Sequence, residues 1–227
     1  MDTVSVTGNA VLSNLGLFGE GLKITVLISL CAIPLAITLG TMIALFRLSN
    51  ILVLRYFSIV YLEIFRNIPF TIQVFLLYYL LPFYDVRLPS YVVGIFGLSL
   101  YTSAYFSEIV RSAIIALPAG QIEAARAGGM SSFQTLRHIV FPQLPPYVIP
   151  PFINQSASLV KDTAILSTIT VHELTMVAQR VQNETYSFTE PLIFAAFLYL
   201  CVNGTLISLM SLAKKHLQPK NLSLQSP

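Results

Sequence analysis

Charged side chains inside two long apolar stretches are the residues of this chain best suited to bind a charged group. Glu63 and Arg66 stand three positions apart in the first stretch, and Lys161 and Asp162 are neighbours in the second. A guanidinium is a planar set of donors that can hold a carboxylate through two hydrogen bonds. Arg66 therefore suits an anionic group, whereas Asp162 suits a cationic one.

The composition of the chain indicates that these charges lie in a membrane. The 227 residues are 55% hydrophobic and only 10% charged, and their mean hydropathy is +0.74. Soluble globular domains carry about 25% charged residues, so this chain has too few charges to cover a surface that faces water. We therefore expect a membrane protein.

Five uncharged runs of 23, 18, 20, 22 and 23 residues are long enough to be membrane spans. A helix crosses about 30 Å of hydrocarbon with roughly 20 residues and satisfies its own backbone hydrogen bonds there. The predicted spans are about residues 22–47, 54–82, 89–112, 139–168 and 190–213. The chain is thus predicted to be one all-α transmembrane domain over residues 1–227. Charged groups inside a bilayer cost roughly 2.5–3.5 kcal/mol each, which makes Arg66 and Asp162 candidate functional residues.

Basic residues near the span ends predict the orientation of the chain. With the N-terminus outside, eight of them lie on the inner side and three on the outer side. The inner ones are Arg47, Arg55, Arg111, Arg126, Arg137, Lys214, Lys215 and Lys220, and the outer ones are Lys23, Arg87 and Arg180. Since cytoplasmic loops are enriched in Lys and Arg, the N-terminus is predicted outside and the C-terminus inside. The formal net charge of +3 is thus a sign of topology, and no nucleic-acid partner is expected.

Ala36, Gly40 and Ala44 recur at four-residue spacing on the first predicted span. Such a stripe of small residues lets a second helix approach closely. The partner is either a helix of the same chain, which we favour, or a helix of another subunit.

Five prolines crowd the start of the fourth predicted span. They are Pro142, Pro145, Pro146, Pro150 and Pro151. Proline has no N–H to donate, so we expect the backbone here to bend or unwind where protein or water surrounds it.

The longest inner loop, residues 118–138, has the pattern of two short helices. Ser131 and Ser132 precede Phe133, Leu136 and Ile139, which is an N-cap signal followed by helical spacing of apolar residues. A cytoplasmic helix pair with an apolar face needs a cover, which is either the chain's own helices or a partner protein.

The same loop carries a motif with fixed spacing. Glu123-Ala124-Ala125 is followed after three residues by Gly129 and, nine residues later, by Ile139-Val140-Phe141-Pro142. This pattern resembles the cytoplasmic signature of binding-protein-dependent ABC importer permeases, in which Leu is usual at the position of Phe141. Residues 61–69, 104–111 and 159–163 also resemble recurring segments of the polar amino acid branch of that family.

The resemblance implies a fold, a location and partners. It implies a type I ABC importer permease fold with a cytoplasmic coupling helix, in the bacterial inner membrane. The implied partners are two cytoplasmic ATP-binding subunits, an extracytoplasmic amino-acid-binding protein and a second permease subunit, identical or different. The chain has no Gly-Lys dipeptide and hence no P-loop, so it is not expected to be an enzyme. ATP and Mg would be bound by the ATPase subunits, and this chain would bind no cofactor.

The resemblance implies coupling roles for Glu123, Ala124, Ala125 and Gly129. In the family, Glu-Ala-Ala opens a short helix that sits in a groove of the ATPase subunit, and Gly ends that helix with a tight turn. Glu123 is accordingly expected near a helix N-terminus, where the helix dipole favours an anion, and the two alanines are small enough for close approach.

The resemblance also implies that the transported molecule is an amino acid, which carries an ammonium and a carboxylate. Asp162 is predicted to bind the ammonium, and Arg66 to bind the carboxylate with support from Asn67. The alternative for Arg66 is a structural ion pair with Glu63, three residues before it, and the alternative for Asn67 is a structural role. Gln155 lies two helical turns, about 10 Å, before Asp162 and is predicted to contact the substrate's side chain.

Gln155 also suggests which amino acids are carried. In relatives that carry basic amino acids, an acid tends to stand at this place, whereas the amide is neutral and both donates and accepts hydrogen bonds. We therefore expect glutamine, glutamate or aspartate as the substrate, moved by alternating access. The alternative is a core glutamine bonded to a neighbouring helix.

An ion-coupled secondary transporter or channel subunit without an ATPase partner is the alternative function. It would also place Arg66 and Asp162 in the membrane, but it would not need the cytoplasmic helix pair, and five spans are few for it. No catalytic arrangement is visible, and His138, His172 and His216 are too dispersed for a metal site.

Overall fold

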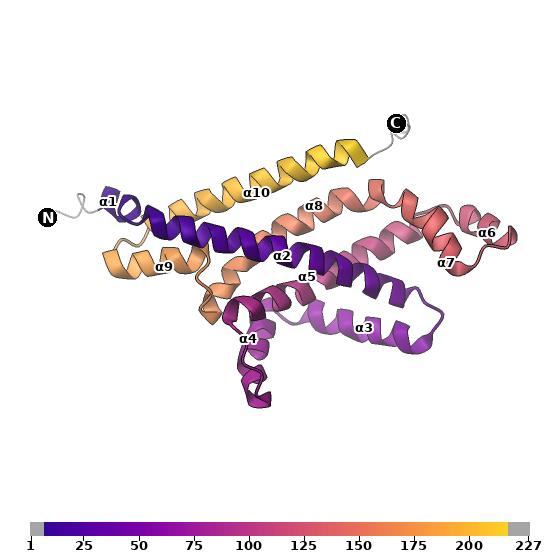
Figure 1. The fold of residues 1–227 in the computed structure, drawn as a ribbon, viewed down its shortest axis with the longest axis horizontal. Coiled ribbons are helices and arrows are strands. Elements are labelled where there is room, and N and C mark those ends of the chain that lie inside the picture. The colour runs from indigo at the N-terminus through magenta and orange to yellow at the C-terminus, as the bar shows by residue number, and fades with distance from the viewer. Residues whose placement is uncertain (1–6, 218–227) are drawn as a thin grey trace.

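The computed structural model describes residues 7–217, most of which are helical (Figure 1). The helices are α1 (Thr7–Leu12), α2 (Leu15–Arg47), α3 (Leu52–Asn67), α4 (Phe70–Leu80), α5 (Ser90–Ile115), α6 (Ala119–Ala127), α7 (Ser132–Thr135), α8 (Pro145–Asp162), α9 (Leu174–Thr185) and α10 (Glu190–Leu217). No strand occurs in the described part of the chain, in agreement with the predicted all-α fold.

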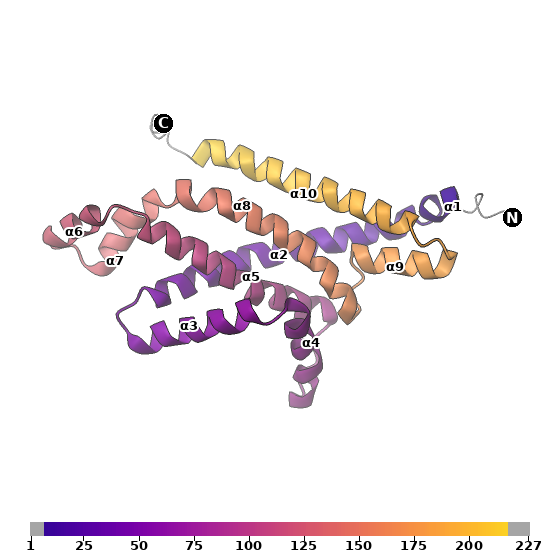
Figure 2. The same ribbon diagram turned by 180° about the vertical axis from the view of Figure 1, so that it is seen from behind.

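The short helices other than α4 gather at the two ends of the long ones (Figure 2). Helices α6 and α7 lie at one end, next to the C-terminal end of α5, whereas α1 and α9 lie at the other. The predicted coupling loop and α9 are therefore at opposite ends of the molecule.

Three helices within residues 7–217 are long and apolar enough to cross a membrane, namely α2, α5 and the Glu190–Leu212 part of α10. The predicted span 54–82 is instead a pair of helices, α3 and α4 with a 3₁₀ turn over Leu81–Tyr84, bent at 106°. The bend falls at Pro69, whose missing N–H ends α3. The predicted span 139–168 has no counterpart among the three apolar helices, because α8, although 18 residues long, contains four prolines and the polar residues Asn154, Gln155, Lys161 and Asp162.

Helices α2 and α5 pack closely through the small-residue stripe. Ala36 and Ala44 are fully buried. A Cβ atom added to Gly40 would lie 2.7 Å from the carbonyl oxygen of Ser103 and 2.7 Å from the Cβ of Phe106. The stripe therefore packs within the chain, which was the favoured alternative.

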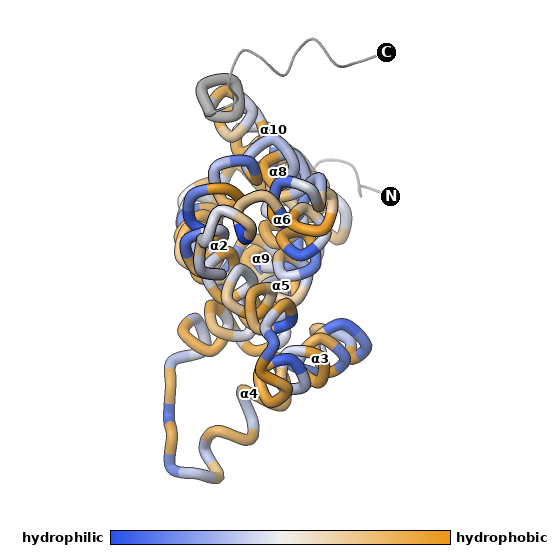
Figure 3. Tube along the Cα trace, turned by 90° about the vertical axis from the view of Figure 1, so that its right-hand side faces the viewer, coloured by the Kyte–Doolittle hydropathy of each residue, from blue (hydrophilic) through white to orange (hydrophobic). Residues whose placement is uncertain are grey.

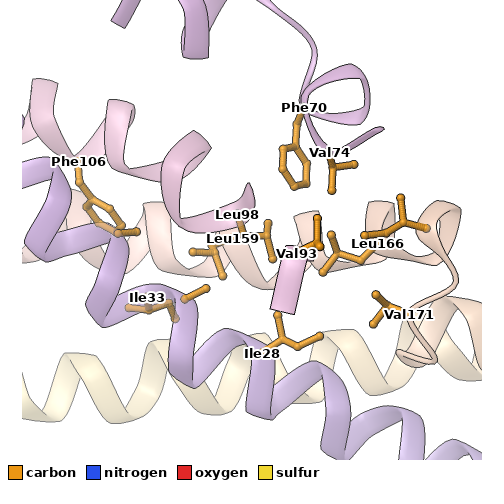
Figure 4. Packing of buried hydrophobic residues seen from close by; sticks show 13 residues of the cluster. Ile28, Ile33, Phe70, Val74, Val93, Leu98, Phe106, Leu159, Leu166 and Val171 are labelled. Carbon is orange, nitrogen blue, oxygen red and sulfur yellow. The ribbon is translucent and has the colours of Figure 1, made fainter. Parts of the chain in front are cut away.

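A cluster of buried apolar side chains joins α2, α4, α5 and α8 (Figure 4). The labelled members are Ile28, Ile33, Phe70, Val74, Val93, Leu98, Phe106, Leu159, Leu166 and Val171. Lipid is as apolar as these side chains, so close packing between them, rather than removal from water, holds helices together in a bilayer. The cluster fixes the first turns of α4 against α5.

The proline-rich segment departs from regular α-helix around Pro142, as predicted, whereas Pro150 and Pro151 lie inside the regular helix α8. A π-helical turn over Leu136–Val140 and a 3₁₀ turn over Phe141–Gln143 precede α8, and Pro145 lies in the first turn of α8. A 3₁₀ segment, Thr163–Ile169, continues the chain beyond α8.

Glu173 caps the N-terminus of α9 although it is fully buried. Its carboxylate accepts hydrogen bonds from the amides of Thr175 (3.0 Å) and Met176 (2.8 Å) and from the Tyr199 hydroxyl (2.5 Å). Burial raises the pKa of the Glu173 carboxyl above its ordinary value, and the hydrogen bond from Tyr199 acts in the opposite direction. This residue ties α9 to α10.

Helix α10 and the α3–α4 pair stand on opposite sides of the central helices (Figure 3). Most side chains of the apolar part of α10 are not buried within the chain. An apolar and uncovered helix of this kind is typical of a surface that faces lipid or another subunit.

Candidate functional site

Arg66 lies in the last turn of α3, directly before the bend, and its side chain lines two neighbouring hollows. The first has a volume of about 490 Å³ and its polar lining residues are Arg66, Tyr105, Glu108, Ser112, Tyr147 and Gln155. The second has a volume of about 300 Å³ and is lined by Arg47, Ile59, Leu62, Glu63, Arg66, Asn67 and Tyr105. Arg66 and Tyr105 therefore form the boundary between the two hollows.

The Arg66 guanidinium is exposed and lies over an aromatic ring. Its Cζ atom is 5.9 Å from the centre of the Tyr105 ring, at cation–π distance. The Tyr105 hydroxyl is 3.2 Å from that of Tyr101, whose ring stacks on Phe70. Phe70, Tyr101 and Tyr105 thus form a row of aromatic side chains. This row connects the first turn of α4, through α5, to Arg66.

The predicted alternative for Arg66, an ion pair with Glu63, is not formed. Arg66 is absent from the ion pairs between described residues. Glu63 instead accepts a hydrogen bond of 2.6 Å from the side-chain amide of Asn67. The guanidinium thus keeps its donors available to the hollows.

Glu108 joins two arginines near the C-terminal ends of α2 and α5. It accepts from Arg47 at 2.7 Å and from Arg111, three residues later on its own helix. Arg47 comes from α2, a helix distant in the sequence. This pairing neutralises Glu108 at the edge of the first hollow, so Arg66 is the cation there that has no acid within ion-pair distance among the described residues.

Gln155 and Asp162 lie on α8, and only Gln155 lines a hollow. Gln155 is half-buried and faces the first hollow together with Arg66. Asp162 is half-buried at the last residue of α8 and is in the lining of neither hollow. Because α8 is helical from Gln155 to Asp162, the two residues lie two turns apart, about 10 Å, on one face. Its neighbour Lys161 is exposed.

The Glu-Ala-Ala segment lies in the middle of α6, which corrects the expectation that it opens this helix. The helix begins at Ala119, so Glu123 is in its fifth position and outside the first turn, where the dipole would favour an anion. Glu123 and Ala124 are exposed, and Ala125 is buried against the chain. The exposed pair is the part of α6 that a partner can contact.

Gly129 ends α6 in the conformation that the sequence predicted. Its φ angle is +81°, and no atom would obstruct an added Cβ, so the backbone conformation itself favours glycine. The backbone amide of Gly129 donates to the carbonyl of Arg126 (3.0 Å), and that of Met130 donates to the carbonyl of Ala125 (3.1 Å). This pair of bonds is a Schellman turn.

Helix α7 begins at the predicted cap. The Ser131 hydroxyl accepts from the amide of Gln134 (3.3 Å), and the Gln134 side chain accepts from the amide of Ser131 (2.8 Å). This reciprocal capping box fixes the turn between α6 and α7.

Sequence reasoning missed Tyr105, Arg47 and Gln73 as neighbours of Arg66. Tyr105 and Arg47 come from other helices, and single-sequence spacing gives no pairing between them. Gln73 did have a signal, since it is a polar residue in an apolar run four residues after Pro69.

Comparison with known proteins places this arrangement in a family. The family model described as binding-protein-dependent transport system inner membrane component matches residues 33–221. The probable glutamine ABC transporter permease protein GlnM of Bacillus subtilis is 34% identical over 187 residues, which is 82% of this chain and 87% of that protein. The octopine transport system permease protein OccM of Rhizobium radiobacter is 32% identical over 210 residues, or 88% of this chain and 86% of that protein.

Solved structures agree with this placement. A crystal structure of an amino acid ABC transporter with histidines matches with a TM-score of 0.82 and 31% identity, covering 90% of this chain and 96% of that chain. The MetNI methionine ABC transporter, in an inward-facing conformation, matches with a TM-score of 0.77 over 91% of this chain and 99% of that chain, at 17% identity, which shows the fold.

The chain is an inner-membrane permease, a multi-pass helical subunit that forms a path through the membrane and does not itself catalyse a reaction. It belongs to the family of binding-protein-dependent transport system inner membrane components, the permeases of ABC transporters. The family predicted from the Glu-Ala-Ala motif is thereby confirmed.

Proposed function

We propose that this permease carries a polar amino acid into the cell by alternating access, and that Arg66 and Gln155 contact the substrate in the first hollow. The observation that carries the proposal is that these two residues, from α3 and α8, line one hollow. A guanidinium without an acid partner among the described residues is suited to bind a carboxylate through two hydrogen bonds.

The ammonium of the substrate is assigned to Asp162. Asp162 lies two turns from Gln155 on the same face of α8. A substrate between the two residues binds Asp162 with its ammonium and contacts Gln155 with its side chain. Asn67 lines the neighbouring hollow, and its side-chain amide donates to Glu63. In this proposal the amide releases Glu63 and donates to the carboxylate of the substrate instead.

The neutral amide of Gln155 favours glutamine, glutamate or aspartate as the substrate. An amide both donates and accepts hydrogen bonds, whereas a long cationic side chain would call for an acid at this position. The relatives named for glutamine support a substrate of this kind.

The family supports the proposed assembly and orientation. The chain pairs with a second permease subunit, identical or different, with two ATP-binding subunits that hold ATP and Mg, and with an extracytoplasmic amino-acid-binding protein. The end that carries α6 and α7 also holds the C-terminal ends of α2 and α5, with Arg47 and Arg111, so it is assigned to the cytoplasm. Lys220, one of the eight inner basic residues, lies outside the described residues.

Five spans cross the membrane in this proposal. The bent pair of α3 and α4 forms the second, and α8 with its 3₁₀ extension forms the fourth. The N-terminus is then outside and the C-terminus inside.

The coupling contact is assigned to the exposed side of α6. Glu123 meets donors of the ATP-binding subunit, Ala124 permits close approach, and the rigid turn at Gly129 passes the motion to the transmembrane helices. A Glu123→Lys complex tests this role: it should lose ATP hydrolysis stimulated by the binding protein, and undiminished stimulation would contradict it.

Uptake into proteoliposomes tests the proposed function. The purified complex should carry radiolabelled amino acid only with ATP and the binding protein, and Asp162→Asn should abolish uptake. Gln155→Glu should shift preference toward lysine or arginine, whereas Gln179→Glu, at an exposed glutamine of α9, should not. Uptake driven by an ion gradient without ATP would favour a secondary transporter instead.

A further inference from the structure

The bend between α3 and α4 leaves two backbone carbonyls without their helical donors. In a continuous helix, the residue at position 69 would donate to Phe65, but Pro69 has no N–H. The amide of Ile72, which would serve Ile68, donates to Pro69 instead at 3.0 Å. Both carbonyls therefore need donors from elsewhere, because an unsatisfied carbonyl is costly inside a membrane.

Gln73 provides both missing donors. Its side-chain nitrogen donates to the carbonyl of Phe65 at 3.0 Å and to that of Ile68 at 2.7 Å. The residue is only 7% exposed, and its side-chain oxygen has no hydrogen-bond partner among the described residues. A buried amide whose oxygen is left unpaired is held in place by its two donors, which bridge α4 back to the end of α3.

Other contacts hold each helix to α5 but leave the joint between them to Gln73. Tyr61 fixes α3, since its hydroxyl donates to the carbonyl of Leu100 at 2.8 Å. Phe70 fixes the start of α4 by stacking on Tyr101, with ring centres 4.9 Å apart. Gln73 is the side chain that bonds from α4 to the last turn of α3 across the bend.

Arg66 is inside the segment that Gln73 holds, between the two carbonyls it bonds. We propose that Gln73 is a positioning residue that fixes the α3–α4 bend and thereby holds Arg66 over Tyr105, facing the hollows. This inference rests on the proposed substrate role of Arg66. Without the two hydrogen bonds from Gln73, the end of α3 is free to move. The guanidinium of Arg66 is then no longer held in one position.

Pulsed electron paramagnetic resonance tests the bend without using substrate. Cys31 and Cys201 are first replaced by Ser, and spin labels are attached at Val53 on α3 and Tyr79 on α4, both exposed. We expect one narrow distance distribution in the parent complex and a broader or shifted one in Gln73→Met. Gln73→Leu, which also lacks the donors but has a branched side chain, should behave like Gln73→Met and guards against an effect of side-chain shape.

Gln182→Met is the matched control for the spin-label experiment. It removes another side-chain amide that donates to a backbone carbonyl, that of Phe188, far from the bend. Its distance distribution should equal that of the parent. An unchanged distribution in both Gln73 variants would overturn the proposal.

Transport kinetics test the consequence for Arg66. In Gln73→Met complexes that assemble normally, the half-saturation concentration for uptake should rise by about tenfold or more, since small displacements of a binding group are costly. ATP hydrolysis without substrate should stay at the parent rate, because Gln73 is remote from α6. A changed bend with unchanged half-saturation would also overturn the proposal. Arg66→Met tests the substrate role separately: normal uptake there refutes the proposed function, whereas the spin-label result still reports on the bend.

Discussion

The guanidinium of Arg66 lies 5.9 Å from the centre of the Tyr105 ring, and these two residues are the ones shared by both hollows. The ring restricts where the exposed guanidinium can move without neutralising its charge. An aromatic face is therefore a suitable partner for a cation that must remain available to an anionic ligand.

Replacing Tyr105 should weaken substrate binding through Arg66. A cation–π contact contributes about 0.5–2 kcal/mol, so Tyr105→Leu should raise the half-saturation concentration for uptake by about 2- to 30-fold. Tyr105→Phe keeps the ring and loses only the hydroxyl contact with Tyr101, and it should remain close to the parent. Equal effects of the two variants would show that the hydroxyl, rather than the ring, matters.

Replacing Gly40 should destabilise the contact between α2 and α5. In Gly40→Ala the new Cβ would lie 2.7 Å from the carbonyl oxygen of Ser103, so the helices must separate, at a cost of about 1–3 kcal/mol. A lower thermal unfolding midpoint of the purified protein in detergent would show this. Gly19→Ala is the control on the same helix, because no atom lies within 4 Å of its added Cβ. Equal midpoints for Gly40→Ala and the parent would mean that the helices are less closely packed than described.

Replacing Gly129 should impair coupling rather than transmembrane packing. Its φ angle of +81° is strained for alanine by about 1–2 kcal/mol, so Gly129→Ala should loosen the turn after α6. Stimulation of ATP hydrolysis by the binding protein should fall, while the unfolding midpoint of the membrane helices changes little. Gly128→Ala is the matched control, since the φ angle of Gly128 is −75° and its added Cβ meets only ordinary contacts at 3.5 Å. Full stimulation in Gly129→Ala would remove the turn from the coupling route.

Local features of the coupling loop could be predicted from the sequence because they depend on neighbouring residues. The cap at Ser131 and the turn at Gly129 follow from side-chain and backbone rules that act within one turn. The start of α6 could not be placed in this way, because the motif does not mark the first helical residue, and Glu123 lies in mid-helix.

The geometry around Arg66 could be predicted only in part. The cost of a charge in the membrane marked Arg66 as a candidate, whereas the predicted span 54–82 ran through Pro69 without a bend. The size of the bend, however, depends on contacts between helices. These are the hydrogen bonds from Gln73 to the end of α3 and the stacking of Phe70 on Tyr101 of α5. The alternative role of Arg66 was an ion pair within its own helix, with Glu63, whereas the structure places the Tyr105 ring of α5 beside it.

Replacing Glu173 should change how stability depends on pH. Burial raises the pKa of this carboxyl, so the folded protein holds the proton more tightly than the unfolded chain. The stabilisation from this proton is complete below the ordinary pKa of 4.5 and is lost as the pH rises through the raised value. In Glu173→Gln this loss should disappear.

The pH effect is measured as the difference in unfolding midpoint between Glu173→Gln and the parent, followed from about pH 4 to 8. As the pH rises, the unfolding midpoint of Glu173→Gln should increase relative to that of the parent. Glu184→Gln is the control, because Glu184 is half-exposed and pairs with Arg180 at the surface. A difference that stays constant across this range would contradict the raised pKa.

The contact of Gly40 with Ser103 also sets an order of events during biosynthesis. Its two sides are 63 positions apart in the sequence, and α3 and α4 are made between them. At about 5–20 residues per second, α2 waits about 3–13 s in the membrane before the ribosome has made its partner helix. A nascent chain that stalls between residues 47 and 90 therefore presents the bare stripe of Ala36, Gly40 and Ala44 to insertion and quality-control factors.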